Sequence, residues 1–333
     1  MSTRLLLLSF ALLIASVAVI AQPKVSPDEQ KMAQAIETAP DAAGKAKAAA
    51  DLVKKYPKSS LRPVYAEKIA DQIREVTDGA QKITLAQQFQ TTFSDPAEQE
   101  MIMPVLIVGY ADAKRPDDAF TTGAAYLGKQ PDSVGVLVEL MTIATDQAKQ
   151  KNGKFVPQGE QYGLHAIELI EANKKPASMS EATWKEYKDL LPRLYQSMGV
   201  IGMVKGDRPT TQARLIKASE LDPKDPFNYL LLSSSLNDDY QEAAKRYQAT
   251  PDGPARTAEL QKVLALLDRL IETDAHFIAL SDGVAQLASI RQQEMKYLET
   301  NYKYRHQGST DGLQQLIDKY KTPAKPKDPF SLP

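Results

Sequence analysis

The sequence predicts an all-α protein built as a solenoid of helical hairpins. Segments rich in strong helix formers carry apolar residues three and four positions apart, a spacing that places them on one face of a helix. No convincing run alternates apolar and polar residues, which is the pattern of a half-buried strand. Prolines, which interrupt helices, recur between the helical segments and so predict short helices, with stops at Pro57, Pro96, Pro131, Pro176, Pro209 and Pro223.

Residues 1–21 are typical of a secretory signal peptide. A short start containing Arg4 precedes the apolar run Leu5–Ile20, and Val19-Ile20-Ala21 fits the small-residue pattern of a cleavage site before Gln22. The run is shorter than the roughly 20 residues that cross a bilayer comfortably. We therefore expect cleavage and a periplasmic or secreted protein, with a retained N-terminal membrane anchor as the alternative.

Composition narrows the range of possible functions. The chain has 333 residues, of which 43% are hydrophobic and 25% charged, and its net charge is −1. A balanced charge argues against a dedicated nucleic-acid binder, which needs a basic surface to neutralise phosphates. Without cysteine there is no disulfide, thiolate metal site or cysteine nucleophile, and only three histidines are present. We expect neither a nucleic-acid partner nor a small-molecule cofactor. Export without disulfides favours a bacterial periplasm or cell exterior.

Four segments show the helical pattern most clearly. Residues 42–56 are strong helix formers that end at Pro57. Apolar residues three or four positions apart form a stripe in each of the other three segments, residues 61–76, 83–93 and 263–271. The apolar piece 101–110 has the length of a strand, but Pro104 disfavours a central strand and the flanking pattern is helical, so a helix is predicted there too.

A repeat begins at Tyr195. The pattern Tyr195-x2-Met198-Gly199-x2-Gly202 leads to Gly206-Asp207, then Leu215, Ala218 and Pro223, and Tyr229 follows 34 residues after Tyr195. The interval from Tyr195 to Pro223 is 28 residues, and the interval from Met103 to Pro131 is the same. This pattern resembles the tetratricopeptide repeat, a 34-residue helix–turn–helix unit. Small residues such as Gly199 and Ala218 would allow close helix approach, while larger ones fill the space between layers.

The resemblance is best over 193–237, fair over 101–140 and weak over 40–75, and the spacing is lost over 240–272. Gly202 and Gly123 depart from the pattern, because they stand where larger residues are usual. The chain is also similar to exported tetratricopeptide-type proteins of Acidobacteria, through segments 178–207 and 303–323. The resemblance implies about five helical pairs over residues 22–320, closed by a capping helix near Asp311–Tyr320. The proline-rich segment 321–333 is predicted to be an extended, disordered tail.

Four motifs could be interpreted as binding sites, and each also has a structural interpretation. Asp222 and Asp225 in KASELDPKDP could bind a cation, but the ligand spacing of a calcium loop is absent and helix capping is preferred. Gly199-x2-Gly202-x3-Gly206 lies in a helical pattern, so close packing and a helix end are preferred to nucleotide binding. His165-x2-Glu168-x2-Glu171 shares one helix face, where a solvated surface is preferred to a metal site. Residues 296–309 interleave basic residues with tyrosines. Packed tyrosine rings are preferred there to stacking on a nucleic acid or glycan.

The function predicted from this pattern is an exported, non-catalytic scaffold that binds a protein or peptide on the concave face of the array. The alternative is an envelope-assembly or secretion accessory subunit at a bacterial membrane, with peripheral membrane association. An enzyme with an active site assembled from distant residues is a third hypothesis, although the sequence has no serine–lysine or G-x-S-x-G motif. The groove-facing positions of the best repeat are predicted to include Arg193, Gln196, Val200, Met203, Phe227 and Leu230.

Overall fold

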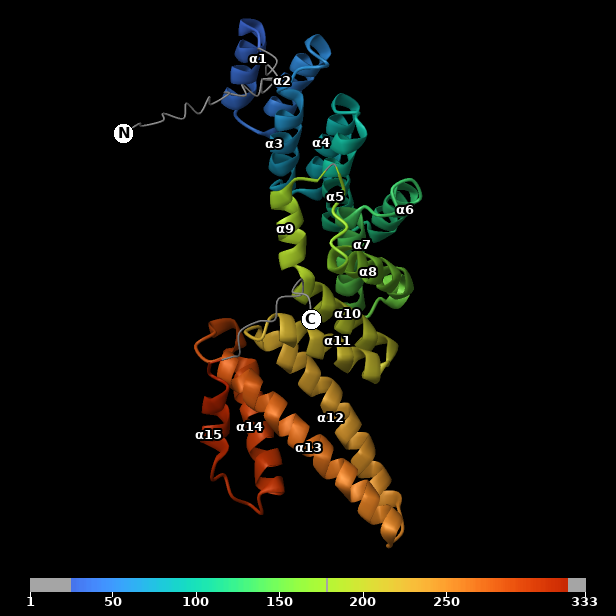
Figure 1. Ribbon diagram of the computed structural model, residues 1–333, viewed down its shortest axis with the longest axis vertical. Coiled ribbons are helices and arrows are strands. Elements are labelled where there is room, and N and C mark those ends of the chain that lie inside the picture. The colour runs from blue at the N-terminus through green and yellow to red at the C-terminus, as the bar shows by residue number, and fades with distance from the viewer. Residues whose placement is uncertain (1–24, 178, 323–333) are drawn as a thin grey trace, which may run out of the picture. The chain divides into compact units, whose positions relative to one another are not determined.

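The computed structural model describes residues 25–177 and 179–322, and within them the protein is all-α (Figure 1). These residues form fifteen α-helices and two short 3-10 helices, and no strand is found among them. The predicted signal peptide and nearly all of the predicted tail lie outside the described residues. The chain divides into two compact units with a boundary between Ile69 and Ala70.

The first unit contains two helices and most of a third. Ser26 begins α1 with a capping box, in which its hydroxyl accepts from the Glu29 amide and the Glu29 carboxylate accepts from the Ser26 amide. Asp41 caps the next helix through the amide of Gly44. Buried Ile36 and Leu52 contribute to the core of this unit. The helices are α1 (Pro27–Thr38), α2 (Ala42–Lys55) and α3 (Arg62–Arg74), which crosses the boundary.

The second unit holds the end of α3 and twelve further α-helices. Those that precede residue 206 are α4 (Gly79–Thr92), α5 (Pro96–Asp112), α6 (Pro116–Leu127), α7 (Val134–Lys149), α8 (Val156–Glu171), α9 (Glu181–Asp189) and α10 (Leu191–Lys205). Those that follow are α11 (Arg208–Leu221), α12 (Pro226–Ala249), α13 (Pro254–Leu280), α14 (Ala288–Arg305) and α15 (Leu313–Lys319). The 3-10 helices η1 (Gly153–Phe155) and η2 (Ala285–Leu287) precede α8 and α14.

Consecutive helices of the second unit pack as hairpins, namely α5/α6, α7/α8, α10/α11 and α12/α13. The first helices of these hairpins lie side by side, because α5 contacts α7, α7 contacts α10, and α10 contacts α12. Among the described residues α1 packs on α2 in the same way, and the consecutive pairs α4/α5 and α13/α14 are also in contact. The contacts therefore do not single out the predicted number of about five pairs. The predicted all-α solenoid of helical hairpins is nevertheless confirmed, and α15 packs on α13 as the C-terminal capping helix.

The α10/α11 hairpin is held together by close contacts at glycine. A Cβ atom added at Gly199 would lie 2.6 Å from Leu215 Cδ2, and one added at Gly202 would lie 2.5 Å from Thr211 Oγ1. Gly206 ends α10 with φ 73°, a left-handed conformation that favours glycine. The interpretation of these three glycines as packing and helix-ending residues is confirmed.

The prolines do not all act as helix stops. Pro57, Pro131 and Pro223 follow the ends of α2, α6 and α11 as predicted, and Pro176 lies between α8 and α9. Two others instead occupy the first turn of a helix, Pro96 in α5 and Pro209 in α11, where a missing backbone N–H costs nothing. The predicted helix over 101–110 is confirmed, since α5 runs through Pro104.

The region that lost the 34-residue spacing contains the two longest α-helices of the described chain, α12 with 24 residues and α13 with 27. The apolar stripe predicted over 263–271 faces the core, since Leu267 is completely buried there. The expectation that the tyrosines of 296–309 pack their rings is wrong for two of three. Tyr302 is buried, whereas Tyr297 and Tyr304 are 55% and 64% exposed.

Candidate functional site

The candidate site is the face of the second unit formed by the first helices α5, α7, α10 and α12, which we call the first-helix face. Gln196 connects two of these helices. Its side-chain amide donates to Asp225 Oδ2 and to Asn228 Oδ1, each at 2.8 Å. Asn228 is almost completely buried and donates in turn to the carbonyl of Asp222 at 3.2 Å. This network fixes the N-terminus of α12 against the middle of α10.

The six predicted groove residues have three different environments. Arg193 and Phe227 are exposed, Phe227 to 45%, while Val200 and Met203 are partly buried. Gln196 is engaged in the network between α10 and α12. Leu230 packs against the core cluster around α13. The structure therefore presents Arg193 and Phe227 to solvent, and it uses Gln196 and Leu230 for internal packing.

The two aspartates of KASELDPKDP lie at helix ends, as predicted. Asp225 is the N-cap of α12 and its Oδ1 accepts from the Phe227 amide at 2.9 Å, with Pro226 in the first turn. Asp222 is the C-cap of α11 and its Oδ1 accepts from the Lys224 amide at 3.1 Å. The capping interpretation is confirmed, and the network through Gln196 gives Asp225 a second role that the sequence did not indicate.

His165 and Glu171 of the predicted motif bind different partners and do not converge on one site. The His165 Nε2 atom lies 2.8 Å from Asp132 Oδ1, and its Nδ1 lies 3.8 Å from the Glu168 carboxylate. Glu171 accepts a hydrogen bond from the Tyr195 hydroxyl at 2.7 Å. Tyr195 is a repeat-pattern residue, so this bond links α8 to α10. Burial and this hydrogen bond raise the pKa of Tyr195.

A group of ionisable side chains around α7 was missed at the level of sequence. Glu139 of α7 is partly buried, and burial raises the pKa of its carboxyl group to about 7 against the opposing charges of Arg74 and Lys82. Lys82 is itself nearly buried and donates to Asp112 Oδ2 at 2.5 Å. A carboxyl group with a pKa near neutrality is suited to exchange protons.

Tyr187 of α9 lies close to this group. A Cβ atom at Gly135 of α7 would be 2.8 Å from the Tyr187 hydroxyl, so only glycine at position 135 allows this approach. Burial, and then the negative charge of Glu139, raise the pKa of Tyr187. A sequence signal did exist, because Glu139 is the only charged residue in the stretch VGVLVELMTIAT (134–145).

A second buried polar group lies between α12 and α13. The Ser233 hydroxyl donates to Asp274 Oδ1, and both residues are buried. Burial raises the pKa of Asp274 to about 7, and the nearby Glu294 acts in the same direction. Close by in sequence, His276 packs edge-on against the rings of Tyr229 and Tyr320, and burial lowers its pKa to about 4. These groups sit inside the helical packing, and the first-helix face does not include them.

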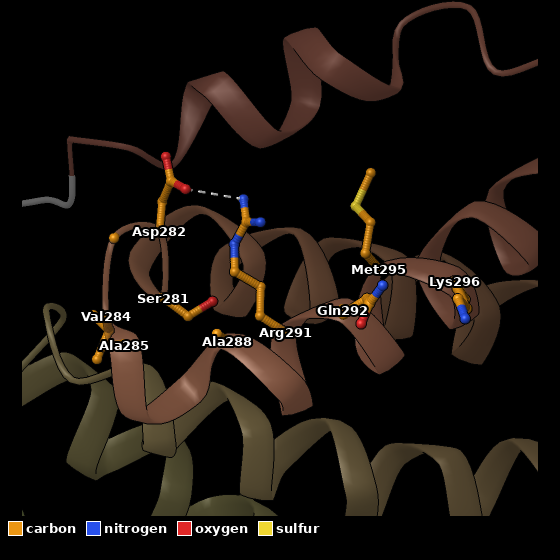
Figure 2. Close-up of a pocket in the computed structure, with 10 residues that line it drawn as sticks. Ser281, Asp282, Val284, Ala285, Ala288, Arg291, Gln292, Met295 and Lys296 are labelled. Carbon is orange, nitrogen blue, oxygen red and sulfur yellow. Dashed lines mark ion pairs between the residues drawn. The ribbon is translucent and has the colours of Figure 1, made fainter.

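A surface hollow of about 460 Å³ lies where α13 ends and α14 begins (Figure 2). Its wall is largely apolar, with Val284, Ala288 and Met295 among the lining residues. Asp282 and Arg291 form an ion pair across it, with Arg291 Nη2 3.3 Å from Asp282 Oδ1. We call this feature the α14 hollow. Its volume falls within the range of ordinary ligand pockets.

No family model matches the chain, and no curated protein or solved structure matches it significantly. Within residues 25–177 and 179–322, no group of three or more histidine, aspartate or glutamate side chains is placed to hold a metal ion. No helix of that same part is both long and apolar enough to cross a membrane. The functional proposal therefore depends on the geometry of the first-helix face.

Proposed function

We propose that the protein is an exported, non-catalytic scaffold that binds a protein or peptide on its first-helix face. The observation that carries this proposal is the hydrogen bond between Gln196 and Asp225, which joins α10 to α12 close in sequence to the exposed residues Arg193 and Phe227. Arg193 lies one turn before Gln196 on α10, and Phe227 lies two residues after Asp225 on α12. Because Gln196 and Asp225 are hydrogen-bonded to each other, the two exposed side chains flank one rigid joint between neighbouring first helices.

The chemistry of the two exposed residues suits a protein partner. Arginine and aromatic side chains are enriched in the central contacts of protein interfaces. Phe227 is held at 45% exposure by a capped helix start, so little conformational freedom would be lost when a partner covers it. Arrays of helical hairpins commonly bind partners along one face of their stacked helices.

Membership of the tetratricopeptide family and export through a cleaved signal peptide belong to the same proposal. The family assignment is supported by the 34-residue interval from Tyr195 to Tyr229 and by the close glycine contacts in α10/α11. Export is supported by the sequence of residues 1–21.

Site-specific photo-crosslinking tests the proposed face. A benzophenone amino acid replaces Phe227, and the full chain is irradiated in envelope and secreted fractions of the bacterium that produces it. The matched control places the same probe at Tyr304, an aromatic side chain that is 64% exposed on α14. We expect a discrete cross-linked protein from position 227 only, and we expect Arg193→Glu to abolish it. The same species from both positions, or none from position 227, would contradict the proposal.

A further inference from the structure

The α14 hollow lies outside the first-helix face and has a chemistry of its own. In Figure 2 the side chains of Asp282, Arg291 and Met295 extend to the same side of the ribbon. Ala288 opens the first turn of α14 and is exposed at the edge of the hollow. The hollow therefore offers an apolar surface with one negative and one positive group beside it, at the ion pair of Asp282 and Arg291.

The described chain ends beside this hollow. Lys321 donates to Asp318 Oδ1 at 2.7 Å, and this bond is the main reason that its pKa is raised. Its ammonium group also interacts electrostatically with Asp282, which raises its pKa further, and with Arg291, which lowers it. Lys321 is thus close enough to the ion pair of the hollow to sense both of its charges. Thr322, the next residue, is the last one described.

The eleven residues that follow, PAKPKDPFSLP (323–333), have a composition that matches the hollow. Lys327 and Asp328 are consecutive in the sequence and opposite in charge. Asp282 and Arg291 are also opposite in charge, and they lie close together in space as an ion pair. Phe330 follows two residues later and is the largest apolar side chain of the segment. The eight residues that follow Thr322, up to and including Phe330, can span up to about 28 Å when fully extended, so Phe330 can reach the hollow from its tether.

From these observations we propose that residues 323–333 of the same chain dock in the α14 hollow. Phe330 covers Met295 and Ala288, while Asp328 and Lys327 pair with Arg291 and Asp282. Tethering favours this occupant over a free peptide of the same sequence, because a short linker holds it at a millimolar effective concentration. Proline at three positions before Phe330 reduces the conformational freedom that docking would remove.

Disulfide trapping tests the docking cleanly, because the natural chain contains no cysteine. The test variant carries Ala288→Cys and Ser331→Cys, which leaves Phe330 in place. The control variant carries Gln293→Cys and Ser331→Cys, since Gln293 is exposed on the same helix and does not line the hollow. Both full-length proteins are oxidised mildly at micromolar concentration, and the intramolecular disulfide is quantified by peptide mapping.

We expect the 288/331 pair to close at least about five times faster than the 293/331 pair. Adding Phe330→Ser to the test variant should reduce its rate to that of the control. Equal rates for the two pairs would overturn the proposal. So would disulfide-linked dimers as the main product, because these would indicate that a second copy occupies the hollow. Retention of the fast rate in the Phe330→Ser variant would overturn the assigned role of Phe330.

Discussion

The hairpins α10/α11 and α12/α13 are neighbours in the chain, yet they pack by different means. In α10/α11 the helix backbones approach at Gly199 and Gly202, where even a single added carbon would clash with Leu215 or Thr211. In α12/α13 the helices are much longer, and the core consists of large side chains such as Leu267 and Phe277 together with the buried pair Ser233–Asp274.

The difference shows which kinds of packing leave a recognisable sequence pattern. Close backbone approach restricts a position to glycine or alanine, so the repeat pattern of α10/α11 can be recognised in its sequence. Large apolar side chains can be exchanged for one another without loss of the fold, so a hairpin that packs through them keeps only its apolar stripe. The predictions that follow test this contrast, from the largest expected effect to the smallest.

Phe277→Ala should cause the largest loss of stability, about 3–5 kcal/mol, because it leaves a cavity in the core of α12/α13. The side chain is 1% exposed in the native structure. The matched control is Phe227→Ala, which removes the same side chain from an exposed site and should cost less than about 0.5 kcal/mol. Chemical denaturation of both variants measures the difference. Similar losses in the two variants would show that Phe277 is not a core residue.

Asp274 should make the stability of the protein fall as the pH rises. Its pKa of about 7 in the folded state exceeds the ordinary value of 3.8, so its contribution is fully present below about pH 4 and is lost as the pH passes 7. Between pH 5 and pH 8 this amounts to about 3 kcal/mol, at 1.36 kcal/mol per unit. Denaturation at both pH values should therefore show a smaller loss for Asp274→Asn than for the natural chain.

His276 acts in the opposite direction, which provides a control. Its pKa of about 4 in the folded state lies below the ordinary value of 6.5, so its contribution is present above pH 6.5 and is lost as the pH falls towards 4. Replacing His276 with Gln should therefore increase the loss of stability that the chain shows between pH 5 and pH 8. Equal pH profiles for Asp274→Asn and the natural chain would mean that Asp274 is ionised in the fold.

Gly199→Ala should destabilise the protein by about 1–3 kcal/mol, because the added methyl group overpacks the interface with Leu215. The control is Gly153→Ala, since a Cβ atom at that position would meet nothing within 4 Å. Thermal unfolding of the two variants should show a clear loss for the first and little change for the second. A neutral Gly199→Ala variant would contradict the explanation of why this hairpin keeps a repeat pattern.

Asp225→Ala should have the smallest effect, about 0.5–2 kcal/mol, through loss of the N-cap of α12. It also removes one of the two acceptors of Gln196. Amide exchange at the start of α12 should accelerate more than exchange elsewhere in the hairpin. The comparison variant is Asp222→Ala, which removes a C-terminal turn contact and leaves the joint at Gln196 intact.

Much of the fold could be predicted from the sequence, because helix boundaries here follow local chemistry. Asp225-Pro226 and Gly206 begin and end helices through their own side chains and backbone preferences. Gly123 looked like a departure from the repeat, yet a Cβ atom there would lie 2.5 Å from Leu140 Cδ1, so a close contact explains it. That contact comes from another helix and is invisible in a single sequence.

The candidate site was less predictable for the same reason. Helical periodicity placed Gln196 and Leu230 in the predicted groove. It could not reveal that Gln196 is hydrogen-bonded to Asn228, or that Leu230 packs against the core around α13. Asp274 did leave a signal, since it continues the core stripe of Leu267 and Ile271. A charged residue at a core position is a better indication of a buried polar pair than any local motif near it.

Hydrogen–deuterium exchange of the full chain, alone and with the partner identified by crosslinking at position 227, tests the central claim most directly. If the partner binds the first-helix face, protection should increase on α10 and α12 and remain unchanged on α11 and α13. Exposed amides near Arg193 and Phe227 should show the largest change. Protection confined to α11 and α13, or to the region of the α14 hollow, would contradict the claim that the first-helix face binds the partner.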